Sequence, residues 1–171
     1  MKYTVGIVVL SDTCAKGGRV DRSGTLIKEI LDNRRDVNGN AVFDVKEYIV
    51  ISDDLQGIEK ALLRLTDDLK LNLILTTGGT GFSPRDNTPE ATKAVIEREA
   101  PGISEAIRAN GMKYTERAML SRAVSGIRKN TLIVNLAGSP KAVDEALTFI
   151  LDTLCHGLDI LLKASSDCAR K

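Results

Sequence analysis

Residues Asn72–Glu90, NLILTTGGTGFSPRDNTPE, decide the fold of this chain. Residues 73–75 form a short apolar run that no polar residue interrupts, which is typical of a strand buried on both faces of a parallel sheet. The glycines that follow allow a sharp turn and expose backbone N–H groups, and Thr88-Pro89 is typical of a helix start with the threonine as N-cap. A strand, a glycine turn and a helix N-terminus in this order predict a cradle for an anion such as phosphate.

The glycine turn is neither of the two common phosphate-binding motifs. No Gly-Lys-Ser/Thr follows the glycines, as a Walker A loop requires, and the spacing is not the G-x-G-x-x-G of dinucleotide-binding domains. The glycines alone therefore leave a second interpretation open, a tight strand-to-helix turn of an ordinary α/β domain. The longer string TTGGTGFSPRDNTPEAT is more specific. It resembles the MogA family of molybdopterin adenylyltransferases, including the equivalent domains of plant and animal enzymes of molybdenum cofactor synthesis.

The length and composition limit the classes of protein to which this chain can belong. A length of 171 residues suits a single domain, 1–171, in which residues 165–171 are expected to form a frayed tail. The sequence has 24 Lys and Arg residues and 23 Asp and Glu residues, and it contains no long basic run. Neither nucleic-acid binding nor membrane binding is therefore predicted as the main task. The first apolar run is too short for a signal peptide or a membrane span. The three cysteines do not have the spacing of metal ligands, and they fit free thiols in a reducing cytoplasm. The only histidine, His156, argues against a Ser-His-Asp site or a histidine-rich metal site.

Apolar periodicity predicts the remaining elements. Strands are expected at residues 5–10, at 43–51 with Phe43, Val45, Ile49 and Ile51 on alternate positions, and in a hairpin of 124–128 and 131–136. Helices are expected at residues 26–31, 58–69, 91–95 (continuing to a stop at Pro101-Gly102), 103–110, 143–154 and, separately, 155–164. This order predicts a three-layer α/β/α sandwich with a mainly parallel sheet and an antiparallel hairpin addition.

Three loops leave the carboxyl ends of predicted strands, where open α/β sheets bind their ligands. They are Ser11–Gly24, Thr76–Asp86 and Asn135–Lys141, and together they could hold two anionic groups and a metal ion. A fourth strand end carries Asp53, which has two interpretations. It could cap the following helix, or, as the resemblance implies, it could act in the same site as Asp86.

The resemblance implies that a phosphate of molybdopterin is joined to the α-phosphate of ATP with release of pyrophosphate. We expect Asp53 and Asp86 to be catalytic and to position Mg²⁺, because two carboxylates beside phosphates need a cation between them. Lys141 is unusual, since a cation in the first turn of a helix opposes the helix dipole by about a few tenths of a kcal/mol. It is either solvated or part of a second anion site. Phosphate and substrate binding are assigned to Ser11, Asp12, Thr77, Gly78, Gly79, Thr80, Gly81, Asn135, Gly138, Ser139 and Lys141.

The same resemblance implies a cytoplasmic homotrimer that binds molybdopterin and ATP and passes its product to the molybdenum insertase. Two alternatives remain at this level. One is a MoaB-type relative of the same fold that does not adenylylate. The other is a non-catalytic module that binds and shields the pterin. Release of pyrophosphate that depends on both ATP and molybdopterin distinguishes the enzyme from both.

Overall fold

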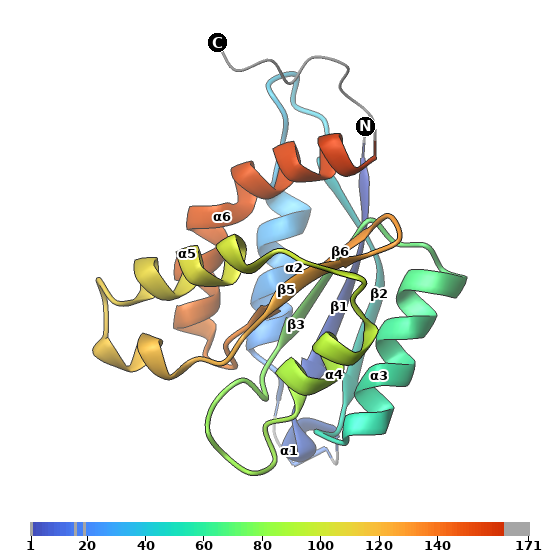
Figure 1. Ribbon diagram of the computed structural model, residues 1–171. Helices are drawn as coiled ribbons and strands as arrows, with labels where there is room; N and C mark the ends of the chain where they lie inside the picture. Colours follow the sequence, from blue (N-terminus) through green and yellow to red (C-terminus); the bar gives the residue numbers. More distant parts are fainter. Residues whose placement is uncertain (1, 16, 19, 163–171) are drawn as a thin grey trace.

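A central β-sheet organises the computed structural model, which describes residues 2–15, 17, 18 and 20–162. Within these residues the sheet has six strands in the order β2-β1-β3-β6-β5-β4 (Figure 1). Strands β2, β1, β3 and β6 are parallel, whereas β5 and β4 are antiparallel additions. The strands are β1 (Tyr3–Leu10), β2 (Phe43–Ile51), β3 (Leu73–Thr77), β4 (Arg98–Glu99), β5 (Ser125–Arg128) and β6 (Thr131–Leu136).

Helices cover both faces of the sheet, so the predicted three-layer fold with a parallel sheet and an antiparallel hairpin is confirmed (Figure 1). Helices α2, α5 and α6 pack on one face and α3, η1 and α4 on the other. Alternate residues of each inner strand point to opposite layers, as Ile7 and Val8 do. The helices are α1 (Asp12–Ala15), α2 (Ser23–Asn33), α3 (Leu55–Leu63), the π-helix η1 (Arg64–Asp68), α4 (Thr88–Val95), α5 (Pro101–Gly111), the 3₁₀-helix η2 (Glu116–Leu120) and α6 (Pro140–Leu161).

Strand β3 occupies the position that its apolar run predicts. All of its residues are buried, and it pairs in parallel with β1 on one side and β6 on the other. The carboxyl ends of these strands therefore lie side by side at one edge of the sheet. The glycine turn that follows Thr77 lies at the middle of that edge.

Edge strand β2 does not keep a single alternation along its length. Its register against β1 shifts between Val5 and Gly6, where a β-bulge inserts one residue. Before the bulge, Phe43 and Val45 face the α2 and α6 layer; after it, Ile49 and Ile51 face the α3 and α4 layer. The expectation that all four share one alternating pattern is wrong, because a one-residue insertion reverses the face of every later side chain.

Two predicted helix boundaries also differ from the structure. Pro101 does not end a helix but begins α5, after α4 has ended at Val95 and the short strand β4 has intervened. Proline suits this place because the first helical residue needs no N–H donor within its helix. Residues 155–161 are not a separate helix but continue α6, whose buried stripe runs on through Leu154 and Leu158. The predicted tail, 165–171, lies outside the described residues.

Helix α6 is 22 residues long, yet its apolar side chains form only one buried stripe. In the described part of the chain, no helix has both the length and the apolar character needed to cross a membrane.

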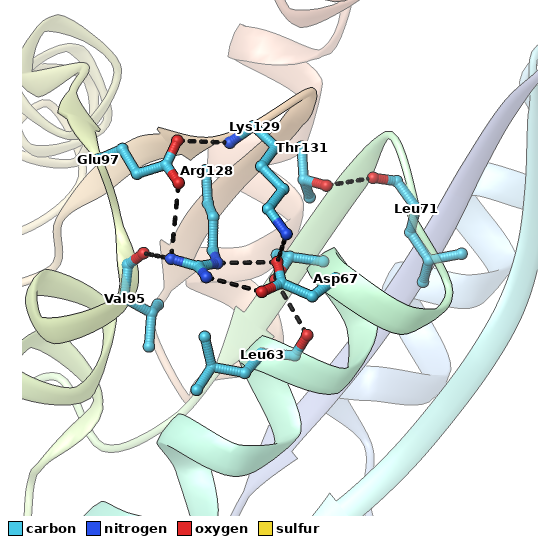
Figure 2. Close-up of polar contacts among 9 residues, drawn as sticks. Leu63, Asp67, Leu71, Val95, Glu97, Arg128, Lys129 and Thr131 are labelled. Carbon is cyan, nitrogen blue, oxygen red and sulfur yellow. Dashed lines mark hydrogen bonds and ion pairs between the residues drawn. The ribbon is translucent and has the colours of Figure 1, made fainter.

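A polar cluster closes the end of the sheet opposite the glycine turn. Figure 2 shows Arg128 and Lys129, from the hairpin, converging on Asp67 of the π-helix. Arg128 Nε donates to Asp67 Oδ1 at 2.9 Å and its terminal nitrogen to Oδ2 at 2.6 Å, while Lys129 Nζ lies 3.1 Å from Oδ1. A second branch of the guanidinium donates to the carbonyl oxygen of Val95 at 3.0 Å. These contacts, the Asp67 cluster, join η1, α4 and the hairpin.

Candidate active site

The turn after β3 requires glycine at two successive positions. Gly78 and Gly79 have φ angles of +101° and +63°. A β-carbon on Gly78 would lie 2.3 Å from the carbonyl oxygen of Leu10, and one on Gly79 would lie 2.4 Å from Thr88 Oγ1. No side chain fits at either place, so the ends of β1 and β3 and the start of α4 can meet closely.

The backbone amides of this turn do not all remain available for a phosphate. Gly78 N–H donates to the carbonyl oxygen of Leu136 at 3.2 Å, so the fold itself already uses that donor. For the amides of Gly79, Thr80 and Gly81, no acceptor is found among the described residues. The anion-binding role predicted for the turn therefore rests on these three.

Thr88 is not the N-cap of α4, as the sequence suggests. The N-cap is Asn87, and the Thr88 hydroxyl instead donates to the carbonyl oxygen of Gly78 at 2.9 Å. Asn87 makes no side-chain cap; its Nδ2 donates to the carbonyl oxygen of Asp53 at 2.9 Å. Thr88 thus connects the start of α4 to the glycine turn, and Asn87 connects it to the residues that follow β2. Both side chains bond to carbonyl oxygens outside the helix instead of capping it.

Asp53 is likewise not the cap of α3. The cap is Asp54, whose Oδ2 accepts a hydrogen bond from Gly57 N–H at 2.7 Å. Asp53 Oδ1 is buried without a hydrogen-bond partner in the described structure, and it would lie 3.2 Å from a β-carbon on Gly79. Burial, and secondly the negative charge of Asp86, raise the pKa of Asp53. A buried carboxylate oxygen without a donor fits a site for a cation.

The neighbouring carboxylates have partners within the protein. Asp86 Oδ2 accepts a hydrogen bond from Ser83 N–H at 3.1 Å. Asp12 Oδ1 accepts one from Asp53 N–H at 3.3 Å, and its other oxygen forms an ion pair with Arg85. Arg85, the neighbour of Asp86 in the sequence, is therefore directed at Asp12.

The described residues do not complete a metal site by themselves. Among the described residues, no group of three or more His, Cys, Asp or Glu side chains could hold a metal ion. Asp53 and Asp86 could supply two of the oxygen ligands of a Mg²⁺ ion. This number is sufficient, because Mg²⁺ commonly takes its other ligands from phosphates and water.

A larger and a smaller cavity, both lined by described residues, border the turn. The larger, about 480 Å³, lies between the turn, α5, η2 and the start of α6, and Thr80, Gly81, Asn135, Ser139 and Lys141 line it. The smaller, about 190 Å³, is lined by Ser11, Thr77, Gly78 and Gly138 among others. A β-carbon on Gly138 would lie 3.3 Å from the Cα of Gly78, so the turns after β3 and β6 also touch. The structure thus brings all three predicted loops to one edge of the sheet.

Two of the predicted contacts serve the fold itself. Asn135 is fully buried; its Nδ2 donates to the hydroxyls of Thr76 and Thr92, each at 2.9 Å, and its Oδ1 accepts from Val124 N–H at 3.2 Å. Thr77 donates its hydroxyl proton to the carbonyl oxygen of Ala137 at 2.7 Å. Neither side chain has a donor left for a ligand. By contrast, Ser139 stands at the N-cap of α6 with no side-chain cap, and its hydroxyl remains available.

The sequence did not single out two residues that the structure places here. Arg122 precedes β5, and its guanidinium donates hydrogen bonds to the carbonyl oxygens of Gly81 and Asp86. Glu145 of α6 lines the larger cavity, and its Oε1 is buried without a hydrogen bond among the described residues. Lys141 Nζ lies 3.9 Å from this oxygen, at the i, i+4 spacing that was its only sequence signal.

Known proteins match this chain over most of its length. The family model described as "Probable molybdopterin binding domain" matches residues 6–156. The molybdopterin adenylyltransferase of Helicobacter pylori J99 is 37% identical over 160 residues, 92% of this chain and 87% of the relative. The Escherichia coli K12 enzyme of the same name is 37% identical over 158 residues, covering 90% and 78%. The crystal structure of the molybdopterin biosynthesis enzyme MoaB from Thermus thermophilus superposes with a TM-score of 0.85 at 41% identity, covering 94% of this chain and 97% of that one.

Proposed function

This chain belongs to the molybdopterin-binding domain family, and on that premise we propose that it transfers the adenylyl group of ATP to molybdopterin. The observation that carries the proposal is the buried Asp53 Oδ1, which lies beside the glycine turn and its free amides. The negative charge of Asp86 is near enough to contribute to the raised pKa of Asp53. A pterin-binding module that only shields its ligand has no need of a second carboxylate beside a phosphate site. The pair suits phosphoryl chemistry.

In the proposed reaction a phosphate oxygen of molybdopterin attacks the α-phosphorus of ATP. The bond from this phosphorus to the bridging oxygen breaks, and pyrophosphate leaves with that oxygen and the bond's electron pair. Because the nucleophile is already an anion, no strong base is required. Catalysis then consists of positioning two anionic groups and neutralising their charge. The amides of Gly79, Thr80 and Gly81 would hold a phosphate, and Lys141 would add a positive charge at the wall of the larger cavity.

Asp53 and Asp86 would hold Mg²⁺ in this scheme. The ion would neutralise phosphate charge that the two carboxylates would otherwise repel. For the protein itself, the consequence is that Asp53 must be ionised when the metal binds, although its surroundings favour the protonated form.

The decisive experiment measures pyrophosphate release with ATP, Mg²⁺ and molybdopterin, omitting each in turn. We expect release only with all three, and a loss of orders of magnitude in Asp86→Asn, which keeps the size of the side chain but removes its charge. Binding of molybdopterin and folding should survive in the variant. Pterin binding without pyrophosphate release by the parent protein would indicate a MoaB-type relative or a shielding module instead. Full activity of Asp86→Asn at saturating Mg²⁺ would remove Asp86 from the mechanism.

Family resemblance supports further parts of the proposal: a single functional domain over 1–171, a cytoplasmic homotrimer and transfer of the product to the molybdenum insertase. Light scattering coupled to size-exclusion chromatography tests the trimer. Co-purification with the insertase, with and without product, tests the transfer.

A further inference from the structure

Glu145 presents a polar feature that the proposed chemistry does not use. It lies on the second turn of α6 and lines the larger cavity, but it belongs to neither the glycine turn nor the pair of aspartates. Its side chain is only 14% exposed, and Oε1 is buried with no hydrogen bond among the described residues. A buried carboxylate oxygen left without a donor calls for a ligand that brings one.

The surroundings of Glu145 do not supply that donor. Lys141 Nζ lies 3.9 Å from Oε1, beyond hydrogen-bond distance, and its side chain is 81% exposed. Lys141 partly offsets the charge of the carboxylate but donates no hydrogen bond to the buried oxygen. Asn110 is close, but its Nδ2 donates to the backbone carbonyl of Glu145 at 3.3 Å rather than to the carboxylate. Neither neighbour therefore forms a hydrogen bond with the buried carboxylate oxygen.

The same cavity joins Glu145 to the phosphate-binding turn. Thr80 and Gly81 line one part of it and Glu145 another, while Ile107, Leu120 and Ala146 add apolar walls. Its volume of about 480 Å³ is in the range of pockets that hold ligands with fused rings. A ligand with its phosphate at the turn would extend its ring system across the apolar walls toward Glu145.

We propose that Glu145 determines specificity for the pterin ring, by accepting hydrogen bonds from its 2-amino group and its N3–H. This assignment rests on the proposed function and adds to it the group that recognises the ring. The two pterin donors are adjacent and coplanar, so they match the two acceptor oxygens of a carboxylate. Adenine presents a donor and an acceptor at its corresponding edge, and a carboxylate there would meet the lone pair of N1. Glu145 thus selects the pterin and rejects the adenine of ATP at this wall.

Isothermal titration with two probes tests this directly. One is a pterin carrying a phosphomethyl group at C6, and the other is its lumazine counterpart, with oxygen in place of the 2-amino group. The parent protein should prefer the pterin. In Glu145→Gln one amide N–H must oppose a ligand N–H, so pterin affinity should fall about tenfold to a hundredfold, and the preference over lumazine should largely disappear. ATP affinity should stay within about twofold, since a contact that ATP does not make contributes nothing to its binding.

Glu105→Gln is the matched control. Glu105 is exposed on α5, so this variant makes the same chemical change away from the cavity. It should leave both probe affinities unchanged, and circular dichroism should show that all variants melt near the parent temperature. An unchanged preference for pterin in folded Glu145→Gln overturns the assignment, even if the parent protein releases pyrophosphate. Loss of the preference in a protein that never releases pyrophosphate would support Glu145 as the pterin contact and reject the proposed transfer.

Discussion

Arg122 Nε donates a hydrogen bond to the carbonyl oxygen of Gly81 at 2.7 Å. The same guanidinium donates to the carbonyl oxygen of Asp86 at 2.6 Å and forms an ion pair with Glu90 on α4. The backbone N–H of Arg122 also bonds to Thr80 O at 2.9 Å. One residue outside the loop therefore holds both ends of the segment between the glycine turn and Asp86.

Arg122→Lys should impair catalysis more than stability. A lysine ammonium cannot reproduce the planar arrangement that reaches two carbonyl oxygens and a carboxylate together. Because small displacements of catalytic groups are costly, we expect the rate of adenylyl transfer to fall about tenfold to a hundredfold, with a smaller change in the Michaelis constant for ATP. Arg128→Lys, in the Asp67 cluster, is the control. It should lower the melting temperature without changing the rate, and equal behaviour of the two variants would make Arg122 a purely structural residue.

Asp53→Asn should stabilise the protein while abolishing its activity. The fold raises the pKa of Asp53, so the ionised form is disfavoured and its removal is favourable. Water still reaches part of the site, and we expect a rise in melting temperature at neutral pH of about 1–3 °C. The gain should grow as the pH rises through the raised pKa of Asp53 and vanish below the unfolded-chain pKa of about 4.

Mg²⁺ gives an independent measure of the same residue. With nucleotide present, it should raise the melting temperature of the parent protein but not of Asp53→Asn. Asp54→Asn keeps a good N-cap residue and should respond to Mg²⁺ as the parent does. If Asp53→Asn is less stable than the parent at neutral pH, its carboxylate has a structural partner.

Gly79→Ala separates backbone strain from steric overlap. Gly79 has a φ of +63° and no room for a β-carbon beside Thr88 Oγ1, whereas Gly39 has a φ of +80° and open space around it. Gly39→Ala should therefore cost about 1 kcal/mol, from the left-handed conformation alone. Gly79→Ala should cost about 2–3 kcal/mol because the overlap adds to the strain. Urea unfolding measures both, and equal costs would show that the turn has room to relax.

Lys141→Gln should weaken ligand binding without lowering stability. The lysine is exposed in the first turn of α6, where its charge opposes the helix dipole, and its contact with Glu145 is long. We expect an unchanged or slightly raised melting temperature, with affinity for ATP or for the pterin phosphate reduced about threefold to tenfold at low salt. The loss should shrink as the salt concentration rises. Unchanged affinity for both ligands at low salt would return Lys141 to the solvated surface.

Asp67→Asn should lower stability in a way that depends on pH. Hydrogen bonds from Arg128, and further bonds from Lys129 and Thr66, hold the pKa of Asp67 well below its usual range. Its stabilising effect is therefore complete above the unfolded-chain pKa of about 4 and is lost as the pH falls below that value. Melting temperatures of parent and variant should converge in acid. Exposed Asp68, changed to Asn, is the control for the loss of one negative charge from η1.

Several features of this protein followed from local sequence alone. The apolar run at 73–75 predicts a strand buried on both faces, and β3 is fully buried and paired with β1 on one side and β6 on the other. The order of strands, glycines and helix starts predicted the layers and the parallel sheet with its hairpin. These inferences succeed because burial on two faces, turn formation and helix initiation each depend on residues close together in the chain.

The tertiary structure decided which polar atoms remain free. Thr88, Asn135 and Thr77 all belong to motifs that look ready to bind a ligand, yet each donates to backbone or side-chain atoms in the fold. From the sequence, Asp53 could be an ordinary helix cap and Glu145 a surface acid, yet each has a buried oxygen to which no described residue donates. A hydrogen bond is decided by which atoms lie within about 3 Å, and here those atoms come from strands and helices far apart in the chain, so no local pattern could show the outcome.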